Sequence, residues 1–141
     1  MRIGKAATFV LVLMLPIVFG GAVQAQTIQF SVTNIGLKSG ESTELSDVYF
    51  INTNCKSLLT ATPEVEILDG PPGVTATINP AKVVPHGYSC AKPIAGGKLV
   101  LSAKDIQDYS YTRMVLRISY KTVMGDRQRT ENINVSLFPS N

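Results

Sequence analysis

A strict two-residue alternation of apolar side chains near the end of the chain limits what it can fold into. Apolar residues occupy every second position of two runs: Met114, Leu116, Ile118 and Tyr120, then Ile133, Val135 and Leu137. Side chains two apart in a β-strand share a face, so this alternation predicts two half-buried strands. Gly125-Asp126 lies between the runs and predicts the reversal of a hairpin. Helical periodicity is nearly absent from the rest of the chain.

Further strand candidates fill the sequence before this hairpin. Residues 27–34 and 64–68 alternate, whereas the apolar run within residues 45–52 suits a strand buried on both faces. Residues 74–78 and 98–103 complete the set. The expected turns and loops contain glycine or proline: Gly36, Gly40, residues 70–73, Asn79-Pro80 and Gly96-Gly97. Seven to eight short strands predict an all-β fold, an antiparallel β-sandwich of immunoglobulin-like topology.

The first 25 residues have the three parts of a cleavable secretory signal. Arg2 and Lys5 precede an apolar run of about 14 residues, and Val23 and Ala25 supply small residues before a cleavage site. That run is shorter than the roughly 20 residues that a spanning helix needs. We therefore expect residues 1–25 to be removed and residues 26–141 to form a single periplasmic or secreted domain with no membrane span.

Much of the positive charge belongs to the predicted signal. The chain has 13 Lys+Arg and 10 Asp+Glu, and residues 1–25 hold two of the bases and no acid, so the remainder carries 11 minus 10, or +1. Dedicated nucleic-acid binders usually carry a large positive excess. We therefore expect no nucleic-acid partner.

The two cysteines, Cys55 and Cys90, predict one disulfide in an oxidising compartment. The bridge closes a loop of about 36 residues and stabilises the fold by about 4 kcal/mol in the chain-entropy description. As reduced thiols the same residues would form a three-ligand zinc set with His86, an alternative that lacks the usual close cysteine pair. Copper would be left with Met124 and one histidine, because Met114 is expected to face the core. We expect no metal and no cofactor.

Asp105 and Tyr109 precede the first hairpin strand at a spacing that resembles a tyrosine corner, although a tyrosine in a surface loop explains the spacing more simply. Two longer segments carry a family resemblance: Glu64-Val65-Glu66-Ile67 running into Gly70-Pro71-Pro72-Gly73, and Cys90-Ala91-Lys92-Pro93 with Gly96-Gly97-Lys98. They are similar to small exported proteins of alphaproteobacteria. The resemblance covers most of residues 26–141 and implies an exported, immunoglobulin-like protein, but it carries over no activity.

Catalytic groups are sparse. His86 is the one histidine, and Ser89 and Cys90 follow it in the same loop, where neighbours rarely converge on one reacting atom. Glu64 and Glu66 share a strand face about 7 Å apart. The other acids considered as a glycosidase pair lie near turns: Asp69, Asp105 and Asp108. We expect this protein not to be an enzyme.

The predicted binding residues are basic and belong to the hairpin: Arg113, Arg117, Lys121, Arg127 and Arg129. We expect the five charges to gather at one end and on one face of it. On a nearly neutral domain they would attract an anionic partner, and arginine would bind its carboxylate or phosphate groups. The alternative is an ordinary solvated face that discourages edge pairing.

These features predict a monomeric, non-catalytic interaction module that binds an envelope protein or an anionic polymer. Two other functions stay open. A structural or assembly subunit of a surface structure would use residues 26–34 as a donated strand. An inhibitor of a hydrolase would insert the loop of residues 84–93, with His86 and Tyr88 as contact residues.

Overall fold

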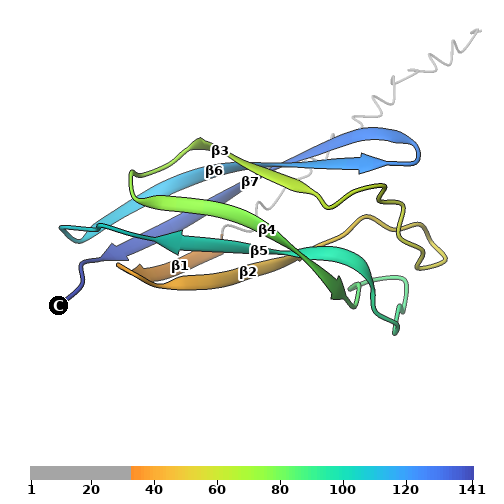
Figure 1. The fold of residues 1–141 in the computed structure, drawn as a ribbon, viewed down its shortest axis with the longest axis horizontal. Helices are drawn as coiled ribbons and strands as arrows, with labels where there is room; N and C mark the ends of the chain where they lie inside the picture. The colour runs from red at the N-terminus through yellow and green to blue at the C-terminus, as the bar shows by residue number, and fades with distance from the viewer. Residues whose placement is uncertain (1–32) are drawn as a thin grey trace, which may run out of the picture. The chain divides into compact units, whose positions relative to one another are not determined.

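The computed structural model describes residues 33–141, and this part of the chain folds into seven β-strands in two sheets (Figure 1). The strands are β1 (Thr33–Lys38), β2 (Ser42–Val48), β3 (Glu64–Asp69), β4 (Val74–Val83), β5 (Ile94–Ala103), β6 (Ser110–Thr122) and β7 (Gly125–Phe138). The predicted all-β class is confirmed. The predicted signal, residues 1–25, and most of the first predicted strand lie outside the described residues.

The strands form a four-stranded sheet A, in the order β1-β7-β6-β3, and a three-stranded sheet B, in the order β2-β5-β4. Neighbouring strands are antiparallel, with the exception of β1, which runs parallel to β7. The sheets lie face to face as two layers (Figure 1). The arrangement is that of a β-sandwich, in which the inner faces of both sheets make the core.

The core follows from the alternation in β6 and β7. The apolar positions of both strands face sheet B and are at most 4% exposed: Met114, Leu116, Ile118, Tyr120, Ile133, Val135 and Leu137. Leu99 and Leu101 of β5 meet them from the other sheet and are fully buried. Because β6 and β7 pair directly, these residues form one continuous apolar layer. The predicted hairpin is confirmed.

Three expected turns are wrong. Gly36 lies inside β1, Pro80 inside β4, and Gly96-Gly97 inside β5. Pro80 is tolerated because β4 is an edge strand of sheet B, where a missing N–H leaves no neighbouring strand unpaired. Gly96 and Gly97 permit close approach of neighbouring chain segments, so these two glycines indicate packing and not a reversal.

Two further boundaries also differ from the prediction. The run within residues 45–52 is not a strand buried on both faces; β2 ends at Val48 and is an edge strand. The hairpin reverses at Val123-Met124, two residues before the predicted position, because Thr122 and Gly125 form its last pair. Gly125 supplies the positive φ, +99°, that an L-residue rarely adopts.

The connections gather at two opposite ends of the sandwich, which we call the hairpin end and the C-terminal end (Figure 1). The hairpin end carries the β6–β7 reversal, the β2–β3 connection and the β4–β5 loop. The predicted Cys55–Cys90 disulfide is confirmed there, with Cα atoms 5.6 Å apart, and it ties the last two connections together.

The C-terminal end carries the β1–β2, β3–β4 and β5–β6 connections and residue 141 (Figure 1). Tyr109 lies in the β5–β6 connection and is 60% exposed, with its ring 5.2 Å from that of Phe138. Tyr109 is therefore not the buried tyrosine of a tyrosine corner.

Candidate functional site

The hairpin register divides the five predicted basic residues between two faces of sheet A. Arg113, Arg117 and Lys121 lie on the outer face, away from sheet B. Arg127 pairs with Tyr120, and Arg129 pairs with Ile118, so both arginines lie on the inner face. The expectation of five charges on one face is wrong. The reason is parity: Arg127 and Arg129 are separated by even numbers of residues from Ile133, which faces the core.

The outer-face bases lie among acidic and polar partners. Arg117 forms an ion pair with Glu66 of the neighbouring strand β3, with Nη2 and Oε2 2.6 Å apart. Arg113 donates from Nε to the Oδ1 atom of Asn132, at 3.0 Å. Lys121 faces Asp126 across the hairpin. This surface therefore has mixed charge, as is typical of a solvated sheet face.

The inner-face arginines lie where the hairpin extends past the end of sheet B. They line an open pocket of about 300 Å³ whose other walls are aromatic or polar: Tyr49, Phe50, Tyr120 and Gln128. The rings of Phe50 and Tyr120 are 5.7 Å apart and tilted by 51°. Phe50 packs against Tyr120, which is 4% exposed, and the two rings line the same pocket as Arg127 and Arg129.

Tyr49 is anchored to the loop that carries the disulfide. Its hydroxyl accepts a hydrogen bond from the backbone N–H of His86, at 3.0 Å, and donates one to the carbonyl of the same residue, at 3.1 Å. Because Cys90 holds this loop to Cys55, the disulfide restrains one wall of the pocket. A wall fixed in this way loses little conformational freedom when a ligand binds.

The two arginines differ in their partners. Arg129 forms an ion pair with Glu131, two residues further along β7. Arg127 donates from Nη1 to the carbonyl oxygen of Asp126, at 3.1 Å, and forms no ion pair within residues 33–141. Arg127 is therefore the guanidinium with most of its donors available to a ligand.

The pKa of the Tyr120 phenol, at the base of the pocket, is shifted from its ordinary value. Burial raises the pKa of the Tyr120 phenol, and the neighbouring Arg129 guanidinium opposes the shift. A neutral phenol is favoured in this setting because a phenolate would be poorly solvated. Tyr120 is therefore an uncharged, buried support for the Phe50 ring.

The sequence patterns do not indicate that Tyr49 and Phe50 form walls of a pocket. Tyr49 and Phe50 were assigned to a buried strand, although they follow β2. The parity of Arg127 and Arg129 with Ile133 was a signal in the sequence that could have placed them above Tyr120. No pattern in the sequence revealed that sheet B ends early enough to leave this surface open.

The other candidate residues do not converge. His86 and Ser89 are exposed in the β4–β5 loop, and the thiols of the zinc alternative are joined as a disulfide. Glu64 and Glu66 lie on edge strand β3 and point outward. Within residues 33–141 no group of three His, Cys, Asp or Glu side chains is placed to hold a metal ion. The same residues include no helix with the length and apolar character that a membrane crossing requires.

Comparison of this chain with protein-family models, with curated proteins and with solved structures finds no match.

Proposed function

We propose that this chain is a non-catalytic interaction module that binds an anionic group of its partner in the pocket of Arg127 and Arg129. One observation carries the proposal: Arg127, which forms no ion pair within residues 33–141, lines the same pocket as the ring of Phe50. Arginine binds carboxylate and phosphate through two parallel hydrogen bonds, and a partly enclosed site strengthens them relative to open solvent.

The pocket favours an anion attached to a flat or apolar group. The half-buried Phe50 presents ring surface in the pocket that Arg127 and Arg129 line, Tyr120 supports it from below, and Gln128 adds an amide. An aromatic or aliphatic group gains by covering such rings, whereas a free inorganic anion gains nothing from them. An acidic side chain or terminus of an envelope protein, or a substituted anionic polymer, has this chemistry.

The strand order supports an immunoglobulin-like topology for the module. In that fold one sheet contains the third, sixth and seventh strands, and the other contains the second, fifth and fourth. Here β3, β6 and β7 are neighbours in sheet A, and β2, β5 and β4 make sheet B. In this proposal β1 is the first strand of the immunoglobulin-like fold, and it belongs to sheet A beside the last strand, β7, and not to sheet B.

An exported location is part of the proposal. The Cys55–Cys90 disulfide supports it, because such bonds persist in oxidising compartments. The signal pattern of residues 1–25 supports it independently. The assembly-subunit alternative has less support, because β7 is flanked by β1 on one side and β6 on the other, where a donated strand would need a vacant place.

Titration of the oxidised protein with benzoate and with phenyl phosphate tests the anion site. We expect chemical-shift changes at the Arg127 and Arg129 side chains that weaken with salt. Arg127→Gln should weaken binding by about 10-fold or more, because a charged hydrogen bond contributes about 1.5–3 kcal/mol. The matched control is Arg113→Gln, which removes the same charge from the opposite face of the hairpin.

Arg113→Gln should change the dissociation constant by less than about twofold. An equal loss in both variants would mean that net charge, and not the pocket, attracts the anion. Absence of shifts at either arginine with both probes would overturn the proposed site.

A further inference from the structure

Three exposed aromatic side chains cluster on the outer face of sheet A at the C-terminal end. Tyr109, Tyr111 and Phe138 are 60%, 61% and 44% exposed. Tyr109 and Phe138 lie with ring centroids 5.2 Å apart and planes tilted by 51°. Tyr111 is on β6 opposite Ser136, and Phe138 follows two residues later on the same face of β7. We call these three rings the aromatic platform.

Small and polar residues lie beside these rings. Ser136 of β7 lies between Tyr111 of β6 and Gly36 of β1. Tyr111 is therefore the one large side chain among these three paired residues. In the next row along the strands, Asn134 donates from Nδ2 to the Oδ1 atom of Asn34, at 3.1 Å. The platform therefore combines open ring faces with hydroxyl and amide groups.

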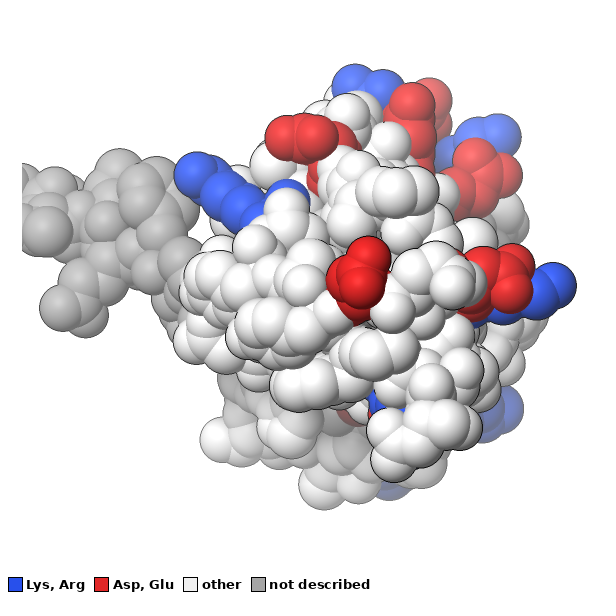
Figure 2. Space-filling model, turned by 90° about the vertical axis from the view of Figure 1, so that its left-hand side faces the viewer, with Lys and Arg blue, Asp and Glu red and all other residues white. Residues whose placement is uncertain are grey.

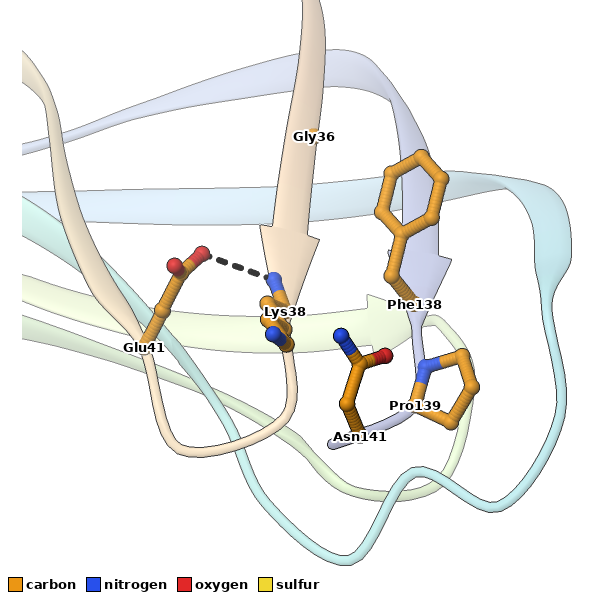
Figure 3. A pocket seen from close by; sticks show the side chains of 6 residues that line it. All are labelled: Gly36, Lys38, Glu41, Phe138, Pro139 and Asn141. Atoms are coloured by element: carbon orange, nitrogen blue, oxygen red, sulfur yellow. Dashed lines mark hydrogen bonds between the residues drawn. The ribbon is translucent and has the colours of Figure 1, made fainter.

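A pocket of about 440 Å³ adjoins the platform (Figure 3). It is lined by Gly36, Lys38, Glu41, Phe138, Pro139 and Asn141. The Glu41 carboxylate accepts a hydrogen bond from the backbone N–H of Lys38, at 2.9 Å. The Phe138 ring and the Asn141 amide border the same space (Figure 3). The volume falls within the range of about 300–1,000 Å³ that small-molecule sites occupy.

Two of the side chains that line this pocket are charged, Lys38 and Glu41, and their charges are opposite. The α-carboxylate of Asn141 adds one negative charge. Figure 2, which looks onto the C-terminal end, shows a largely uncharged surface with most charged side chains toward its rim. The two ends of the sandwich therefore differ in the charge of their pockets, because the pocket lined by Arg127 and Arg129 lies at the hairpin end.

We propose that the aromatic platform and its adjoining pocket bind a neutral saccharide chain. A sugar ring has C–H groups on its faces, which pack on aromatic rings, and hydroxyl groups on its edges, which need donors and acceptors. Tyr111 and Phe138 supply ring surface, while Ser136, Asn134 and Asn141 supply polar groups. This proposal concerns a different site and a different ligand class from the anion pocket.

A protein partner, including a second copy of this chain, fits the platform less well. Cores of protein interfaces combine aromatic residues with aliphatic ones in a continuous buried patch. The exposed aliphatic side chains of the described chain lie elsewhere: Leu68 on β3, Val84 in the β4–β5 loop, and Val123 and Met124 at the hairpin reversal. The platform instead combines the Tyr109–Phe138 ring pair and the Tyr111 ring with the neighbouring Ser136 hydroxyl and Asn134 amide.

Titration of the oxidised protein with maltotetraose, cellotetraose and tetra-N-acetylchitotetraose, followed by NMR and calorimetry, tests the proposal. We expect at least one of these chains to bind, with shifts confined to the platform and the pocket. Tyr111→Ala and Phe138→Ala should each weaken binding by about 10-fold, because each removes a ring face on which the sugar packs. Salt should have little effect, in contrast to the anion site.

Two controls separate saccharide binding from general loss of apolar surface. Leu68→Ala removes a side chain with the same 44% exposure as Phe138 from the other edge of sheet A, and binding should not change. Gly36→Val fills part of the site without deleting a ring, because Gly36 lines the pocket. The fold should tolerate the change, because a Cβ there makes only ordinary contact with Phe138, at 3.5 Å. We expect a folded Gly36→Val protein that no longer binds, which decides the question even if Phe138→Ala fails to fold.

Absence of platform shifts with all three saccharides at millimolar concentration would overturn the proposal. Binding that Leu68→Ala weakens as much as Tyr111→Ala, or that Gly36→Val leaves intact, would also overturn it. Self-association that Tyr111→Ala abolishes, with no saccharide binding, would assign the platform to a second copy. Arg127→Gln should leave saccharide binding unchanged, so failure of the anion site and failure of this site are distinguishable.

Discussion

The alternation of side chains along β6 and β7 determines which face of sheet A each basic residue of the hairpin occupies. Arg127 and Arg129 face the side of the sheet that is apolar further along the strand, and they remain exposed because sheet B does not reach them. Arg113 and Arg117 face solvent beside Asn132 and Glu66. Residues of the same type on one hairpin thus differ in their partners: Arg117 and Arg129 are neutralised by Glu66 and Glu131, whereas Arg127 forms no ion pair within residues 33–141.

The Tyr120 phenol gives a pH-dependent test of the pocket. Burial raises its pKa, so the folded state holds the proton more tightly than the unfolded state does. The stabilisation is fully present below about pH 10, the ordinary tyrosine pKa, and is lost as the pH rises through the higher folded-state pKa. In an alkaline absorbance titration, the difference between the native protein and Tyr120→Phe should show a phenol that ionises above about pH 10.

Tyr120→Phe keeps the ring against Phe50, so the comparison isolates the hydroxyl. Arg129→Gln should raise the same pKa further, because the guanidinium favours the phenolate. A difference curve with its midpoint at or below pH 10 would contradict the burial of this phenol.

At the scale of the strand, β5 shows why a glycine pair need not be a turn. Gly96 and Gly97 are buried in the central strand of sheet B. A Cβ on Gly97 would collide with Cγ2 of Ile78 and lie 3.1 Å from the carbonyl oxygen of Asn79. We expect Gly97→Ala to lower the free energy of unfolding by about 1–3 kcal/mol, measured by urea denaturation.

The matched substitution is Gly36→Ala, on an edge strand, where the new methyl group makes an ordinary 3.5 Å contact. Its effect should stay below about 1 kcal/mol. Equal effects of the two substitutions would show that backbone entropy, and not the close approach of β4, determines the cost at Gly97.

Elements with a strong local pattern could be predicted from the sequence, and those set by their neighbours could not. The alternation of β6 and β7 identified the strands and their buried faces, because a one-residue shift would have exposed Leu116 and Val135. Pro80 and Gly97 were assigned to turns because their local preferences point there, whereas their places in β4 and β5 depend on which strands lie beside them. For the same reason the sequence does not predict the pocket of Arg127 and Arg129, whose walls come from segments as distant in the chain as Tyr49 and Arg129.

At the scale of the whole molecule, the disulfide joins two connections of the hairpin end. Its reduction should lower the free energy of unfolding by up to about 4 kcal/mol and the melting temperature by up to roughly 15 °C, because it frees a loop with a sequence separation of 35 residues. We expect the sandwich core to keep the reduced protein folded at room temperature. Circular dichroism melts with and without reductant measure the change.

A variant in which both cysteines are replaced by alanine serves as the control, because its melting temperature should not respond to reductant. Two free thiols in the protein purified without reductant would contradict the bridge. An unchanged melting temperature on complete reduction would mean that the loop is restrained by other contacts, such as the pair of hydrogen bonds between Tyr49 and His86.

The parallel pairing of β1 with β7 joins segments 100 residues apart in the chain, as the bond between Asn34 and Asn134 shows. Contacts so distant in sequence raise the contact order, and all-β chains of this kind fold over milliseconds to seconds. β1, the first of the described strands to be synthesised, must therefore wait for β7 before it has its partner in sheet A. During that interval its free edge and that of β7 are open to other chains.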